Sequence, residues 1–153
     1  MVLSAGEQAP AFELFDNEGN LHKLSDYEGQ TIVVYFYPRD DTPGCTKEAC
    51  SFRDAYADFR EAGVEVIGIS PDNEGSHSKF INKYQLPFIL LSDPDHNVCE
   101  AFGAWGLKKM YGREYEGVYR TTFVIGPDGV IKHVFENVKP ADHSREVLEV
   151  VNA

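Results

Sequence analysis

Positively charged residues are scarce in this chain, and their scarcity excludes one class of partner. The 153 residues include 14 Lys and Arg against 25 Asp and Glu, which gives a formal net charge of -11. No basic cluster interrupts this pattern, so the surface would repel a phosphate backbone and we expect no nucleic-acid partner. The acidic residues are spread along the chain, which is typical of a soluble, self-repelling surface.

Long apolar runs are also lacking. No stretch approaches the roughly 18 apolar residues that span a bilayer, and residues 1–5 contain neither a basic leader nor a long apolar core. We therefore expect a cytoplasmic protein without a membrane partner. The sequence has no glycine-rich phosphate loop, and its histidines show no metal-ligand spacing, so no metal, haem, flavin or nucleotide cofactor is indicated.

Cysteine is limited to Cys45, Cys50 and Cys99. A chain of this length buries close to ~70% of its unfolded surface, so it needs no disulfide scaffold. Structural disulfides are rare in a reducing compartment, where a close pair of cysteines more often indicates redox chemistry or metal binding. The spacing of Cys45 and Cys50 is therefore the main clue to function.

Alternating strand and helix patterns predict a single α/β domain over residues 1–153. Runs of apolar, largely β-branched and aromatic residues predict strands at residues 31–37, 64–70, 88–91, 121–125 and 130–135. Helices are predicted at residues 45–62, 73–84 and 141–151. This order predicts a thioredoxin-like fold, a central mixed β-sheet flanked by helices. Residues 12–20 predict an N-terminal β-hairpin that extends this domain.

The first predicted helix begins at the carboxyl end of a buried strand, where open α/β sheets place their ligands. Thr42 is a favourable N-cap residue, and Pro43 suits the first helical position. Cys45 then lies in the first turn, among unpaired backbone N–H groups and at the positive end of the helix dipole. This position favours the thiolate, which is the reactive form of cysteine. A merely buried Cys45 is the alternative.

Cys45 and Cys50 cannot bond across an intact helix. Residues five positions apart differ by about 140° around the axis, with Cα atoms roughly 8.6 Å apart. A disulfide spans at most about 7 Å, so a bridge would require at least one turn to unwind. Cys45 shares a helical face with Ala49 and Phe52, whereas Cys50 points nearly opposite, toward solvent. The spacing differs from a C-x-x-C dithiol and from a zinc knuckle.

The pattern Pro38-x-x-x-Thr42-x-x-Cys45 resembles the active-site signature of peroxiredoxins. Cys50, five residues later, resembles the subgroup called peroxiredoxin Q or bacterioferritin comigratory protein. The resemblance covers nearly the whole chain and continues through residues 92–96, 102–106 and 120–125.

This resemblance implies a thiol peroxidase that reduces hydrogen peroxide or organic hydroperoxides. Cys45 would attack the peroxide, with Thr42 hydrogen-bonded to it and Arg120 supplying positive charge. Cys50 would condense with the Cys45 sulfenic acid into an intramolecular disulfide, and an external dithiol such as thioredoxin would reduce it. The residues alone do not choose Arg120 over Arg39. We expect a monomer.

The sequence does not decide between alternative roles for Glu48 and Cys99, or between alternative functions of the protein. Glu48 resembles a family position that holds the arginine, but it equally fits a surface acid near a helix N-terminus. Cys99 is a second candidate resolving thiol or a small buried residue, and Trp105 is expected to pack rather than react. The alternative functions are a thiol-disulfide oxidoreductase, disfavoured by the C-x4-C spacing, and a redox sensor without catalytic turnover.

Overall fold

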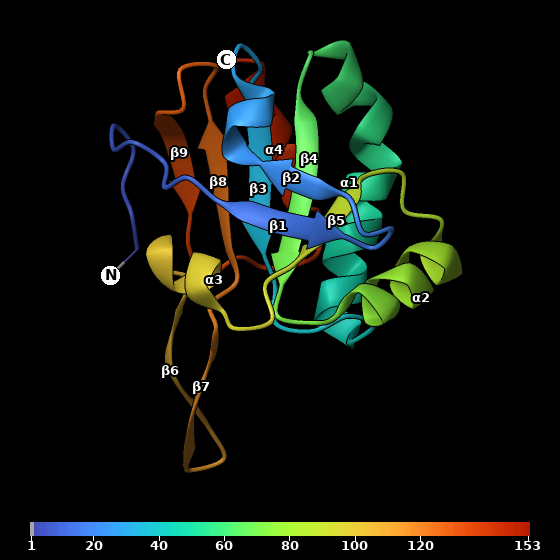
Figure 1. The fold of residues 1–153 in the computed structure, drawn as a ribbon, viewed down its shortest axis with the longest axis vertical. Helices are drawn as coiled ribbons and strands as arrows, with labels where there is room; N and C mark the ends of the chain where they lie inside the picture. The colour runs from blue at the N-terminus through green and yellow to red at the C-terminus, as the bar shows by residue number, and fades with distance from the viewer. Residues whose placement is uncertain (1) are drawn as a thin grey trace.

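A seven-stranded mixed β-sheet forms the centre of the computed structural model, which describes residues 2–153 (Figure 1). Its strands run in the order β2-β1-β5-β4-β3-β8-β9. The strands of this sheet are β1 (Glu13–Asp16), β2 (Leu21–Lys23), β3 (Ile32–Phe36), β4 (Glu65–Ser70), β5 (Ile89–Ser92), β8 (Thr121–Ile125) and β9 (Ile131–Phe135). The helices are η1 (Leu24–Tyr27, a 3-10 helix), α1 (Pro43–Glu61), α2 (Glu74–Tyr84), α3 (Asn97–Ala101) and α4 (His143–Val151).

The strand β3 lies inside the sheet, between β4 and β8, and separates two hydrophobic cores. It pairs in parallel with β4 and antiparallel with β8, and all five of its residues are buried. Because side chains alternate along a strand, Val34 and Phe36 enter one core, and Val33 and Tyr35 enter the other. Helices α1, α2 and α4 contribute to the second core, while α3 belongs to the first. The predicted mixed sheet flanked by helices is confirmed.

The predicted N-terminal hairpin is confirmed as β1 and β2, and it extends the central sheet. β1 pairs antiparallel with β5, with Phe15 opposite Ser92, so it covers the edge that β5 would otherwise expose. The outermost strand is then β2, which has three residues. Within residues 2–153, no helix is both long and apolar enough to cross a membrane.

A second hairpin was missed by the sequence analysis. Strands β6 (Trp105–Met110) and β7 (Arg113–Val118) form a separate two-stranded sheet that projects away from the body of the protein (Figure 1). Tyr111 and Gly112 both have positive φ at its tip, at 51° and 77°. This twisted two-residue turn is favourable in hairpins. Most of the ribbon is exposed, so its residues lack the apolar alternation that identifies a half-buried strand.

Candidate active site

Cys45 lies in the first turn of α1, directly after the loop that leaves β3. Thr42 occupies the N-cap with extended backbone angles, and Pro43 is the first helical residue, as predicted. The Thr42 hydroxyl makes no capping hydrogen bond to the helix and instead donates to the backbone carbonyl of Arg39 at 2.8 Å. The Cys45 side chain is buried, with a residue exposure of 1%.

Arg120, immediately before β8, brings a guanidinium to the sulfur. Its Nη2 lies 3.3 Å from Sγ of Cys45, and its Nη1 donates to Oε1 of Glu48 at 2.8 Å. Gly44 makes room for this approach, because a Cβ at that position would lie 3.1 Å from Nη2. Burial opposes the charge of Arg120, but the Glu48 carboxylate and the Cys45 sulfur outweigh it and raise the pKa of Arg120. The guanidinium is therefore a fixed positive charge beside the thiol.

Glu48 is fully buried and holds the arginine, which resolves the ambiguity left by the sequence. It lies three residues after Cys45, a spacing that places both on the same face of α1. Burial raises the pKa of Glu48 from 4.5 to about 7, against the lowering effect of Arg120. Its second oxygen, Oε2, has no hydrogen-bond partner among the described residues. The Arg120–Glu48 pair orients the guanidinium toward Cys45.

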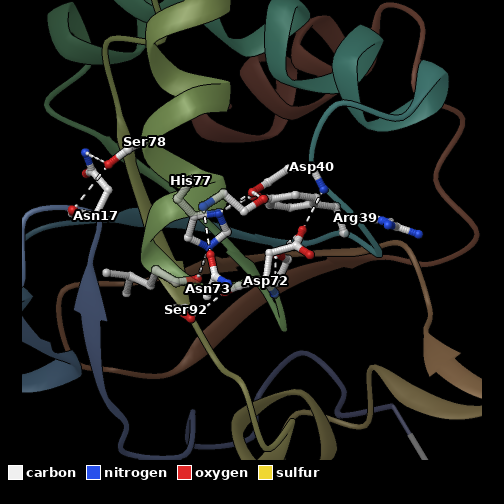
Figure 2. A network of polar contacts seen from close by, with 12 residues as sticks. Asn17, Arg39, Asp40, Asp72, Asn73, His77, Ser78 and Ser92 are labelled. Atoms are coloured by element: carbon white, nitrogen blue, oxygen red, sulfur yellow. Dashed lines mark hydrogen bonds and ion pairs between the residues drawn. The ribbon is translucent and has the colours of Figure 1, made fainter.

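Arg39, the other candidate arginine, is exposed and points away from the residues around it (Figure 2). Trp105 packs, as expected, because its ring stacks on that of His96 with centroids 3.9 Å apart. Of these candidates the structure places Arg120 beside the sulfur.

Cys45 and Cys50 lie on one unbroken helix and are not bonded to each other. Cys50 is half-buried and borders a groove of about 660 Å³ between α1 and the start of α4, lined also by Asp54 and Arg145. Cys45 belongs instead to the core beneath α1. The expected opposite orientation of the two thiols is confirmed.

Cys99 lies on α3 and is buried in the core on the other face of the sheet from Cys45. Burial, followed by the charge of Asp93, raises the pKa of its thiol. Its environment therefore favours the neutral, unreactive thiol.

A polar network that was not expected from the sequence lies behind the active-site loop. Asp40 contacts His77 of α2, and its backbone N–H donates to Asp72 at 2.6 Å (Figure 2). The histidine gave no signal in the sequence, because it lies 37 residues from its partner. Among residues 2–153, no group of three or more His, Cys, Asp or Glu side chains could hold a metal ion.

Comparison with known proteins identifies close relatives. Residues 5–134 match the model of the AhpC/TSA family. The chain is 47% identical over 151 residues to Peroxiredoxin Bcp of Bacillus subtilis, covering 99% of this chain and 96% of the relative. A mutant PrxQ of Xylella fastidiosa superposes with a TM-score of 0.94 at 33% identity, covering 99% and 97% of the two chains.

A third relative is the bacterioferritin comigratory protein of Xanthomonas campestris. Its TM-score is 0.89 at 33% identity, with 99% of this chain and 96% of that chain covered. That structure contains trapped intermediate and ligand complexes that bear on the alkyl peroxide reduction activity of the Xanthomonas protein. These matches confirm the predicted thioredoxin-like fold.

Proposed function

The chain belongs to the AhpC/TSA family and is a peroxiredoxin, and from this premise we propose that Cys45 is the thiol at which it reduces peroxides. The observation that carries this proposal is the contact of 3.3 Å between the Arg120 guanidinium and the Cys45 sulfur at the start of α1. Positive charge and unpaired backbone N–H groups meet at this point, and both stabilise negative charge.

The first step is attack of the Cys45 thiolate on one peroxide oxygen. A sulfur–oxygen bond forms as the oxygen–oxygen bond breaks, and the leaving oxygen takes up a proton to give water or an alcohol. Arg120 stabilises the charge that develops on that leaving oxygen. The Thr42 hydroxyl donates its own hydrogen to the backbone carbonyl of Arg39. Its oxygen can therefore accept a hydrogen bond from the peroxide O–H, and this bond orients the substrate.

The second step joins Cys45 to Cys50. The Cys50 thiol condenses with the Cys45 sulfenic acid, giving a disulfide and one water molecule. Both residues lie in α1, so its first turns must unwind to bring the sulfurs together. The half-buried position of Cys50 supports this role, whereas the buried thiol of Cys99 fits a packing residue.

An external dithiol then reduces the disulfide and completes the cycle. We assign this role to thioredoxin or a similar dithiol protein, and we assign the substrates to hydrogen peroxide and organic hydroperoxides. Such a cycle fits a cytoplasmic protein, because the cytosol keeps dithiol reductants in their reduced form. It also fits a monomer, because both cysteines of the disulfide belong to one chain.

The experiment adds peroxide to the reduced protein in the presence of thioredoxin, its reductase and NADPH. Sustained peroxide consumption is expected, together with a Cys45–Cys50 disulfide in a peptide map of protein oxidised by one equivalent of peroxide. A single turnover without recycling would indicate a redox sensor. Reduction of insulin without peroxide consumption would indicate a thiol-disulfide oxidoreductase.

A further inference from the structure

The carboxylate of Asp40 is the centre of a buried polar network behind the active-site loop (Figure 2). One oxygen accepts a hydrogen bond from the Ser76 hydroxyl at 2.8 Å and lies 2.7 Å from Nδ1 of His77. The other accepts from the Tyr37 hydroxyl at 2.6 Å. The side chains of Asp40 and His77 are 3% and 0% exposed. Two hydroxyl donors stabilise this carboxylate as an anion, and a buried anion requires a compensating positive charge.

The ring of His77 is the group placed to supply that charge. Its Nδ1 faces Asp40, and its Nε2 lies 3.0 Å from the backbone carbonyl oxygen of Leu91. Both neighbours are acceptors, whereas a neutral imidazole carries hydrogen on one nitrogen only and would leave one contact without a proton. With Asp40 ionised, both contacts are hydrogen bonds only if both nitrogens are protonated. Burial and the Asp40 charge raise the pKa of Tyr37 well above its usual value, so Tyr37 remains a neutral donor.

The network fixes the loop that leads to Thr42. The backbone N–H of Asp40 donates to the Asp72 carboxylate at 2.6 Å. Asp41 has a left-handed backbone with φ at 57°, and its carboxylate accepts from Lys83 of α2 at 2.8 Å. A left-handed aspartate is uncommon, and surrounding contacts must hold it in place. The side chains of Asp40 and Asp41 thus fasten the loop to α2 directly before Thr42.

We propose that His77 is a positioning residue for the peroxide reaction. As an imidazolium paired with Asp40, it holds the loop so that Thr42 remains within reach of a peroxide at Cys45. His77 touches none of the reacting atoms and acts through Asp40. This inference rests on the proposed role of Cys45. The Asp40–His77 pair also keeps the loop attached to α2 while the first turns of α1 unwind, so the loop before Thr42 does not move with them.

The test compares two reactions of Cys45 in the variant His77→Asn, whose amide retains a donor near Nδ1 but carries no charge. We expect its second-order rate constant with hydrogen peroxide to fall about tenfold or more, because small displacements of positioning groups are costly. Alkylation of Cys45 by iodoacetamide needs no peroxide-orienting hydroxyl, so its rate should stay the same. A general loss of structure would change both rates.

Ser78→Ala is the matched control on the same helix. The Ser78 hydroxyl contacts Asn17 and takes no part in the Asp40 network, so both rates should equal those of the wild type. If His77→Asn fails to fold, Ser76→Ala replaces it, since this change removes one neutral donor from Asp40 at a half-buried position. Its peroxide rate should fall while its alkylation rate does not. Unchanged peroxide rates in the folded variants would overturn the proposal.

A spectroscopic measurement tests the charge separately. Nitrogen-15 spectra of the reduced protein at neutral pH should show both ring nitrogens of His77 protonated. A ring with one unprotonated nitrogen would overturn the assignment of an ion pair. The proposed function is tested separately by the Cys45→Ser variant, and it is overturned if that variant still reduces peroxide. If the wild type reacts with peroxide at Cys45 and the His77→Asn variant reacts equally fast, only the positioning role of His77 is overturned.

Discussion

The sulfur of Cys45 lies 3.3 Å from a guanidinium nitrogen of Arg120, which is 75 positions further along the chain. The other terminal nitrogen of the same guanidinium donates to the buried carboxylate of Glu48 at 2.8 Å. The guanidinium therefore contacts the carboxylate and the sulfur at the same time, one with each terminal nitrogen. A charge fixed in this way stabilises a developing oxyanion without reorganisation, which is the main source of catalysis in many enzymes.

Arg120→Ala should lower the second-order rate constant with hydrogen peroxide by about 100-fold, a loss typical of removing one oxyanion-stabilising donor. Arg39→Ala is the matched control, because Arg39 lies in the loop between β3 and α1, close in sequence to Cys45, but its side chain is exposed. Stopped-flow measurement of the reaction with peroxide checks both variants. Equal losses in the two would contradict the assignment of Arg120.

Cys45→Ser should abolish peroxide reduction, because the hydroxyl that replaces the thiol is not a nucleophile at neutral pH. The two side chains are close in size, so the free energy of unfolding should change by about 1 kcal/mol or less. Peroxide consumption and urea unfolding measure the two effects. Turnover near the wild-type level would refute the role of Cys45.

Glu48→Gln should make stability less dependent on pH. Burial raises the pKa of Glu48 from 4.5 to about 7, so between these values the folded protein binds a proton that the unfolded chain has released. The stability associated with this proton is complete below pH 4.5 and is lost as the pH rises through about 7. Glutamine retains an acceptor oxygen for Arg120 but does not titrate.

Urea unfolding of the wild type and the Glu48→Gln variant at pH 5 and pH 8 checks this prediction. Between pH 5 and pH 8 the wild type should lose on the order of 2 kcal/mol of unfolding free energy relative to the Glu48→Gln variant. A difference that stays constant would mean that Arg120 keeps Glu48 ionised throughout this range.

Cys50→Ser and Cys99→Ser form a matched pair for identifying the resolving thiol. After one equivalent of peroxide, Cys50→Ser should accumulate a Cys45 sulfenic acid that dimedone traps, and its turnover with thioredoxin should collapse. Cys99→Ser should turn over like the wild type, because the Cys99 thiol is buried on the opposite face of the sheet. The reverse pattern would make Cys99 the resolving thiol.

Oxidation should unwind the first turns of α1. The unwinding breaks several backbone hydrogen bonds, each worth about 1 kcal/mol net, and the disulfide offsets this modest cost. Amide hydrogens across residues 43–52 should therefore exchange faster in the oxidised than in the reduced protein. Circular dichroism should show a matching loss of helix. An oxidised protein with an intact α1 would contradict a Cys45–Cys50 bond.

Local sequence patterns predicted the strands and helix ends, because these are determined by residues close together in the chain. The apolar run of β3 is buried on both faces, and Thr42 and Pro43 mark the start of α1 as expected. The choice of Arg120 over Arg39 required the family resemblance, because it depends on β8 pairing with β3. The Asp40–His77 pair escaped detection for the same reason, since two separate elements supply it.

The hairpin that covers β5 also limits how copies of the protein can associate. A long exposed strand edge is a template on which another chain can add a strand. At this edge of the sheet the outermost strand, β2, offers only three residues, and the Lys23 side chain lies 3.6 Å from Glu13 across the hairpin, which places charge along the rim. The hairpin thereby leaves little room at this edge for a strand of another molecule to add to the sheet.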